Sequence, residues 1–229
     1  MPPQPAALKF LNVLSIILVA VAFGMVVFYA PMEQVMGLVQ KVFYFHVATA
    51  WVGMLGFIVA AVVAIIYLGA KDMKWDMIEL AAVEISLVFF LIAIALGSIW
   101  ARGTWGVWWV WEPRLSTAAF LELFYLAYLL LRDGVEDPER RARFGAVYTL
   151  VGVIAVPITF LSIYILRTIH PVLFGLGGDQ TMAMTGEMYF TMFFSLTAFS
   201  VVFVTLFWHR IRLGQLANKV EELKLKVTE

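Results

Sequence analysis

Five of the eight tryptophans fall within twelve residues, and this density is the strongest chemical signal in the sequence. The cluster comprises Trp100, Trp105, Trp108, Trp109 and Trp111. An aromatic belt at a membrane surface places single tryptophans at most helix ends, so a belt explains only one or two of the five. Indole rings present wide apolar faces and lose little conformational entropy on binding. The segment 100–114 is therefore predicted to bind a large flat ligand.

Charged side chains flank this tryptophan-rich segment. Arg102 and Arg114 supply cations, and Glu112 supplies an anion. A guanidinium fork pairs with two carboxylate oxygens, and a cation is also attracted to an indole face. Haem matches these features, with its macrocycle against the rings and its propionates near arginine. By chemistry alone, a quaternary amine, a sugar or a lipid headgroup matches them as well.

The local sequence suggests how the rings are presented. If a short helix began with Thr104 as its N-cap, three tryptophans would share one face: Trp105, Trp108 and Trp109. Pro113 disfavours helix at the residue before it and directs the chain into the next helix, for which Ser116 or Thr117 is the predicted N-cap. Such a segment would turn three rings toward one ligand.

Two of the three histidines, His46 and His170, are expected near the same end of the protein as the tryptophans. Taken singly, each is more simply a hydrogen-bonded or solvated imidazole, but their shared location favours ligation. Two neutral imidazoles on opposite sides of haem iron complete six-coordination. Arg167 would point the same way as His170, toward a propionate, if the preceding helix continued that far. His209, beside Arg210, fits an ordinary charged flank.

The elements that position these residues are membrane spans. The chain is 63% hydrophobic and 14% charged, with a mean hydropathy of +0.92. Four charge-free runs are long enough to cross a hydrocarbon core, namely 10–32, 42–70, 144–166 and 188–208. Two further runs carry one carboxylate each, 80–101 with Glu84 and 115–131 with Glu122. Because these runs are continuously apolar, they exclude a β-barrel and predict an all-α, polytopic bundle of six transmembrane helices.

The basic residues predict the orientation of the bundle. Twelve lysines and arginines fall on the side of the termini and four on the other side. The positive-inside rule then makes the N and C termini cytoplasmic and places the loops 31–41, 102–114 and 167–187 outside. We divide the chain into a six-span membrane domain, 1–208, and a cytoplasmic amphipathic tail, 209–229. The tail is either a helix lying on the bilayer or a docking segment for another subunit.

The absence of certain residues narrows the chemistry. The sequence has no cysteine, which excludes thiolate metal sites and covalent attachment of c-type haem. A bound haem would therefore be held non-covalently, as haem b. No phosphate-binding loop with its lysine occurs, so any ATP hydrolysis belongs to a partner chain. We predict no catalytic residue, no enzymatic activity of this chain and no nucleic-acid partner.

The stretch 105–116, WGVWWVWEPRLS, resembles the tryptophan-rich signature of the haem-handling proteins of cytochrome c maturation, and most closely that of their C-component family. The resemblance covers nearly the whole chain, including six spans, the external loop and one external histidine on each side of it. A W-G-x-W-W-x-W run is much more specific than a lone histidine. The departure is Glu112-Pro113, where the family usually has Asp-Ala, and this puts the role of the carboxylate in doubt.

The resemblance implies a function and a set of partners. The loop, with His46 and His170, would present haem in transit to a periplasmic haem chaperone at the bacterial inner membrane. An ABC-type membrane subunit, a separate ATPase subunit and a small single-span subunit would surround the chain in the lipid bilayer, and ATP would drive release of the loaded chaperone.

Three alternatives remain open from the residues. A b-type electron-transfer protein would retain its haem, and it would favour a second site on the cytoplasmic side, where only His209 is available. A permease without haem would need a continuous polar path, for which Glu84 and Glu122 are the only hints. A haem-to-cytochrome ligase of a related tryptophan-loop family would be a larger chain with more histidines.

Overall fold

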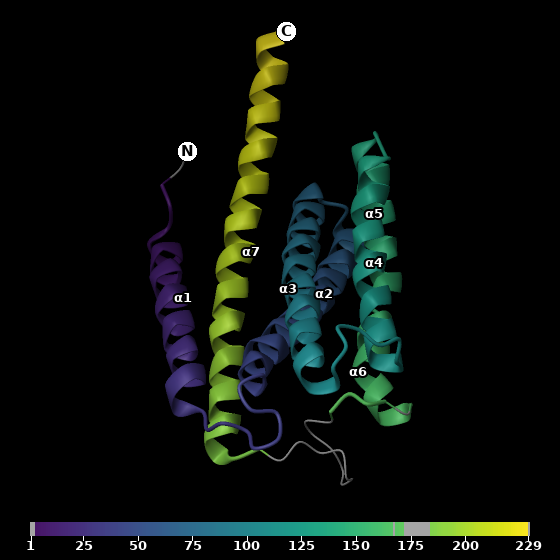
Figure 1. Ribbon diagram of the computed structural model, residues 1–229. Coiled ribbons are helices and arrows are strands. Elements are labelled where there is room, and N and C mark those ends of the chain that lie inside the picture. Colours follow the sequence, from purple (N-terminus) through teal and green to yellow (C-terminus); the bar gives the residue numbers. More distant parts are fainter. Residues whose placement is uncertain (1–2, 167, 172–183, 229) are drawn as a thin grey trace.

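The computed structural model describes residues 3–166, 168–171 and 184–228 as a bundle of long helices (Figure 1). The elements in chain order are α1 (Ala6–Gly24), the π-helical turn η1 (Met25–Tyr29), α2 (Gln40–Ala70), α3 (Met73–Trp105), α4 (Pro113–Asp133), α5 (Pro138–Gly152), α6 (Ala155–Ile165) and α7 (Gly186–Thr228). They provide six helical stretches that are long and apolar enough to cross a membrane. The predicted all-α, six-span fold is confirmed.

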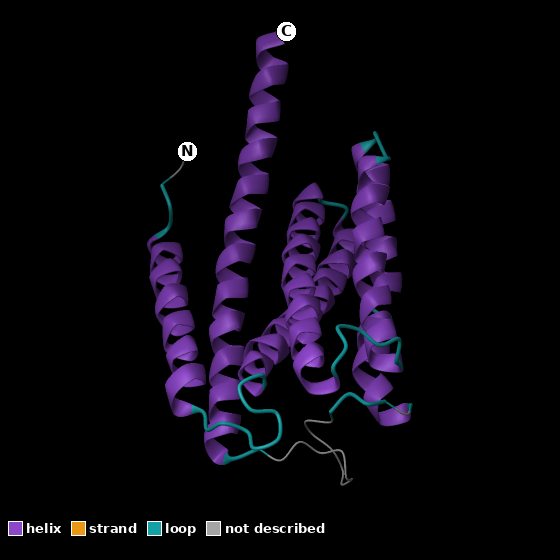
Figure 2. Ribbon diagram, in the orientation of Figure 1, coloured by secondary structure: helices purple, strands orange, loops and turns teal. Residues whose placement is uncertain are grey.

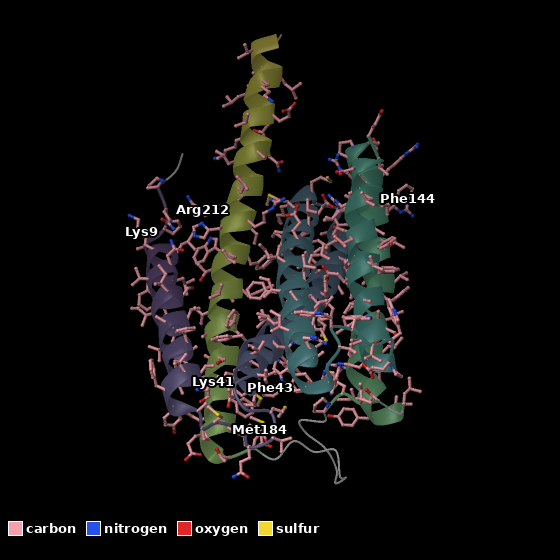
Figure 3. All side chains as sticks on the ribbon, in the orientation of Figure 1. Lys9, Lys41, Phe43, Phe144, Met184 and Arg212 are labelled. Atoms are coloured by element: carbon pink, nitrogen blue, oxygen red, sulfur yellow. The ribbon has the colours of Figure 1, made fainter. Side chains whose placement is uncertain are left out.

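Both ends of the chain lie at one end of the bundle, which we call the terminal end (Figure 1). The connections before α2 and α4 gather at the opposite end, the loop end (Figure 2). Lys9 and Arg212 lie toward the terminal end, and Lys41 lies at the loop end (Figure 3). This arrangement agrees with the predicted grouping of the loops 31–41 and 102–114, whereas most of the loop 167–187 lies outside the described residues. The assignment of the terminal end to the cytoplasm stays a prediction.

Two spans differ from their predicted bounds for local reasons. Helix α3 begins at Met73, seven residues before the predicted start at 80, because the Asp72 side chain caps it and accepts from the Lys74 backbone N–H at 2.9 Å. The fifth span consists of α5 and α6, with an interruption at Val153 and Ile154. Pro157 lacks the N–H that would bond the Val153 carbonyl, which explains the interruption.

Helices α2 and α3 form the centre of the bundle, where glycines permit close approach. A Cβ at Gly53 would lie 3.0 Å from the Phe90 backbone nitrogen, and one at Gly56 would lie 2.0 Å from Ser86 Oγ. The small residues on this face of α2 therefore serve helix packing. Phe57, also on α2, stacks on Tyr125 of α4 with ring centroids 3.9 Å apart.

A buried polar cluster joins α3, α4 and α5 at the terminal end, and the sequence analysis did not foresee it. Arg132 donates to both carboxylate oxygens of Asp76, at 2.6 and 2.8 Å. Glu79 Oε1 accepts from Tyr128 at 3.2 Å and from Thr149 at 2.7 Å. Because each bond joins different helices, the cluster fixes their relative positions deep in the bundle.

Helix α7 is anchored at the same end by two further contacts. Arg210 forms a two-pronged ion pair with Glu84 of α3, and His209 lies 2.8 Å from Asn12 of α1. Glu84 thus has a basic partner within the bundle. Glu122 differs, because it is buried and its Oε2 has no partner among the described residues.

Candidate functional site

His46 of α2 and His170, which follows α6, lie beside each other at the loop end of the bundle. Their ring centroids are 6.5 Å apart and their planes are inclined by 46°. The two residues are 124 positions apart in the sequence, so only the fold brings them together. Helix α6 ends at Ile165, and the extended backbone of Leu166 then directs the chain back over the bundle toward His46.

Each imidazole is oriented by a backbone carbonyl. His46 Nδ1 lies 2.8 Å from the Ala93 oxygen, and His170 Nδ1 lies 3.1 Å from the Pro171 oxygen. A carbonyl only accepts, so Nδ1 carries the hydrogen in both rings and Nε2 keeps its lone pair. This tautomer, with Nδ1–H bonded to a carbonyl, is typical of metal-binding histidines.

Burial also favours the neutral form of His170. Desolvation by burial, reinforced by the nearby Arg114 guanidinium, lowers the pKa of His170 to about 3. The ring is therefore uncharged at neutral pH and available as a ligand. Metal–imidazole bonds of about 2 Å on either side of one iron would separate two ring centres by roughly 6 Å, close to the separation observed.

Gly97 of α3 makes room for His46. A Cβ at this position would lie 2.7 Å from His46 Cε1 and 3.0 Å from Nδ1. Any larger side chain would therefore displace the ring from its position on Ala93. No local sequence pattern indicates this role, because the two residues belong to different helices.

A pocket lined by both imidazoles and by part of the tryptophan-rich segment has about 630 Å³ of empty space, counting the part that is open to solvent. Its lining includes three predicted site residues besides the histidines: Trp105, Trp109 and Arg114. Trp100 and Thr159 line it as well. Within the described residues, the indole nitrogens of Trp100 and Trp109 and the hydroxyl of Thr159 are buried without a hydrogen-bond partner. These open donors suit a ligand with acceptor atoms.

The tryptophan-rich segment does not form the short helix that Thr104 was expected to cap. Helix α3 instead continues to Trp105 and ends at Gly106, whose φ of 76° only glycine adopts without strain. The remaining segment is non-helical, and it leaves Trp108 and Trp111 exposed, at 59% and 76%. These two indoles lie outside the pocket lining.

Glu112 has a positioning role that the sequence interpretation missed. The expected N-cap of the fourth span, Ser116 or Thr117, was wrong, because Glu112 caps α4 by accepting from the Leu115 N–H at 2.7 Å. Its second oxygen accepts from the Thr168 hydroxyl, and Thr168 Oγ accepts from the His170 N–H at 3.0 Å. Glu112 is thereby linked, through the Thr168 side chain, to the backbone N–H of His170.

The three arginines of the predicted site differ in placement. Arg114 lines the pocket, donates to the Thr159 carbonyl and lies 6.0 Å from the Phe160 ring centroid. Arg102 is exposed and donates to the Gly106 carbonyl, outside the pocket lining. Arg167 lies outside the described residues. Its predicted direction toward a propionate required the preceding helix to continue that far, but the helix ends at Ile165.

A second pocket, with about 890 Å³ of empty space, lies on another side of the histidine pair. It shares His46, His170 and Arg114 with the first pocket and is otherwise walled by α2, α6 and α7. Its lining is strongly aromatic and apolar, including Trp51 and Phe193. The imidazoles are thus accessible from two directions.

Comparisons with known proteins identify the family of the chain. The family model described as "CcmC: Heme exporter protein C" matches residues 4–226. The heme exporter protein C of Bradyrhizobium diazoefficiens is 31% identical over 198 residues, which cover 86% of this chain and 74% of the relative. That of Rhodobacter capsulatus is 30% identical over 204 residues, with 86% and 81% covered.

The Escherichia coli K12 protein of the same name is 30% identical over 164 residues, with 71% of this chain and 66% of the relative covered. The six spans and these relatives agree with a multi-pass protein of the bacterial inner membrane. Since the match extends over nearly all of the sequence, the chain belongs to the heme exporter protein C family.

Proposed function

We propose that this chain binds haem b between His46 and His170 and hands it to a periplasmic haem chaperone for cytochrome c maturation. The observation that supports this is the pair of neutral imidazoles with free Nε2 atoms, set 6.5 Å apart. In the described residues no group of three or more His, Cys, Asp or Glu could hold a bare metal ion. Two ligands suffice if a porphyrin supplies four more.

The surroundings of the pair suit the rest of such a molecule. Trp105 and Trp109 offer aromatic faces along the pocket, and Arg114 offers a cation for a propionate. The unpartnered indole N–H groups of Trp100 and Trp109 add two donors for carboxylate oxygens. Arg167 stays a predicted propionate partner that the described residues do not include.

Several features favour transfer over permanent residence. The chain has no cysteine to form thioether bonds, and the pocket lies at the loop end, next to the exposed Trp108 and Trp111. These two indoles form a surface that a chaperone can contact when it takes up the haem. The resemblance adds an ABC-type membrane subunit, a separate ATPase and a small single-span subunit as partners that would drive release.

Absorbance spectroscopy of the purified protein tests the ligand assignment. We expect wild type, titrated with haem, to give bis-histidine bands, and His46→Ala and His170→Ala each to lose them. His209→Ala is the matched control, because this histidine contacts Asn12 at the terminal end and should leave the spectrum unchanged. Bis-histidine bands that persist in both site variants would reject the assignment.

A transfer assay separates haem delivery from haem retention. The haem-loaded chain is mixed with a purified periplasmic haem chaperone, and the haem content of each protein is followed over time. We expect haem to appear on the chaperone, faster for wild type than for a Trp108→Ala/Trp111→Ala variant. Haem that stays on the chain and cycles between redox states would instead support a b-type electron-transfer protein.

A further inference from the structure

The end of α7 carries an apolar seam that is mostly exposed in the described part of the chain, with only Leu216 half-buried beside the start of α3. Helix α7 runs without a break from Gly186 to Thr228 and extends well past the other helices at the terminal end (Figure 3). Its seam residues are Leu213, Leu216, Val220, Leu223 and Val227, spaced alternately three and four apart. This spacing is the a and d pattern of a coiled coil. Val220, Leu223 and Val227 are 45%, 61% and 86% exposed.

The residues beside the seam are basic. Arg212, Lys219 and Lys226 follow one another at intervals of seven along one edge, which are the g positions when Leu213 is an a position. Lys224 occupies an e position on the other edge. The acidic residues Glu221 and Glu222 fall at b and c, away from the seam. The charged residues at both edges of the seam are therefore positive.

The seam continues a face of α7 that is used inside the bundle. Thr205 bonds Ser15 of α1 at 2.9 Å, and His209 lies 2.8 Å from Asn12. Positions 205, 209 and 213 are four residues apart and so share one helical face. Helix α1, which covers this face, begins only at Ala6, so the face continues toward the C terminus beyond its helical neighbour.

A concave corner beside this face extends the surface available to a partner. It has about 1350 Å³ of empty space between the start of α3 and the projecting part of α7. Met73, Met77, Leu213 and Leu216 supply apolar lining, and Lys74, Arg212 and Lys219 supply positive charge. Glu222 lines the corner as well, so Lys and Arg outnumber acidic residues in its lining by three to one.

We propose that residues 212–227 form one strand of a heterotypic coiled coil with an acidic amphipathic helix of another subunit. A second copy of this chain would set lysine against lysine in either relative direction, which destabilises the pair. Glutamates at the edge positions of the partner would instead meet Arg212, Lys219 and Lys226. A helix resting on the bilayer would require a bend after the span, and α7 has none.

The test uses the full-length chain in nanodiscs of zwitterionic lipid and two labelled synthetic helices of about three heptads. Both helices have leucine and valine at a and d; one has glutamate at every e and g position, and the other has lysine. We expect fluorescence anisotropy to show binding of the acidic helix at least roughly tenfold tighter than the basic one. The variant Arg212→Glu/Lys219→Glu/Lys226→Glu should reverse this preference.

Control variants distinguish the contribution of the apolar seam residues to binding from that of charge. Leu216→Asp/Leu223→Asp should abolish binding, whereas Glu221→Gln, at a b position outside the corner, should preserve it. A fluorophore on Ala217→Cys, unique in this cysteine-free chain, reports the environment of the tail in anionic and zwitterionic nanodiscs. Equal binding of both helices, self-association through the tail, or immersion of the label in anionic lipid would each overturn the proposal.

Discussion

The two ends of the bundle differ in whether their buried polar groups have hydrogen-bond partners. At the terminal end, Arg132 and Asp76 satisfy each other, and one oxygen of Glu79 accepts two hydrogen bonds, although its second oxygen has no donor in the part of the chain that the structure describes. At the loop end, two imidazole nitrogens keep free lone pairs, and the Trp100 and Trp109 N–H groups lack acceptors among the described residues.

This difference separates stabilising groups from binding groups. A buried polar atom without a partner costs about 1–3 kcal/mol, so a fold tolerates several of them together chiefly where a ligand completes them. The terminal end therefore holds the helices together, whereas under the proposed function the loop end would keep its donors and ligand atoms in place for haem. Changes at the first end should act on stability, and changes at the second on haem binding.

The largest expected effect is on stability, from Asp76→Ala. This substitution leaves the Arg132 guanidinium buried without its counter-ion and should lower the free energy of unfolding by about 3–5 kcal/mol. Denaturant titration of the purified protein measures it. Lys74→Ala, which removes an exposed ion pair with Asp72, should leave the midpoint unchanged. An Asp76→Ala midpoint equal to that of this control would contradict the stabilising role.

The next effect is on haem binding, from Gly97→Ala. The new methyl group would meet His46 Cε1 at 2.7 Å and displace the ring, so haem affinity should fall by about 10- to 100-fold with folding retained. Gly69→Ala, where a Cβ meets nothing within 4 Å, is the matched control in a membrane helix. Unchanged haem titration curves for Gly97→Ala would show that the position of His46 does not matter.

A smaller effect is expected from Glu112→Ala. The variant loses the cap of α4 and the acceptor for Thr168, so His170 is held less firmly and haem affinity should fall about tenfold. Glu112→Gln keeps an acceptor oxygen and should fall less. The two haem titrations are compared with the unfolding midpoints, since loss of a cap alone costs about 1 kcal/mol of stability. A loss of stability without any loss of haem affinity would reduce Glu112 to a helix cap.

The smallest effect is expected from Arg102→Gln. Arg102 is exposed and lies outside the pocket lining, so haem affinity should change by no more than roughly twofold. Arg114→Gln, which removes the cation that lines the pocket, should weaken binding more. Equal losses for the two variants would mean that both arginines reach the ligand and that the pocket extends to the outer edge of the segment.

The spans were predictable because hydropathy is a local property. Runs such as 42–70 are apolar enough to identify without any tertiary information. The density of tryptophans and the placement of His46 and His170 near one end followed in the same way. The juxtaposition of the two rings did not follow from the sequence, because it depends on the path of the chain after Ile165.

The errors have physical causes that can be named. Gly106 is a typical terminating residue after a helix, and it could have predicted the end of α3. Glu112 directly before Pro113 is an N-cap followed by proline at the first helical position, a known start signal. Asp76 and Arg132 are 56 residues apart, and no periodic pattern links them. Gly97 likewise has meaning only through its neighbour on another helix.

The interruption at Val153 and Ile154 divides the fifth span into two mechanical units. Through Thr149, α5 is fastened to the polar cluster at the terminal end, whereas α6 contacts Arg114 and leads into the segment that carries His170. The Val153 carbonyl accepts from Val156 rather than from residue 157, which leaves the backbone easier to bend there. The two halves of the span are therefore held by different contacts, so a substitution that loosens the polar cluster at Thr149 should disturb α5 more than α6 and the segment that carries His170.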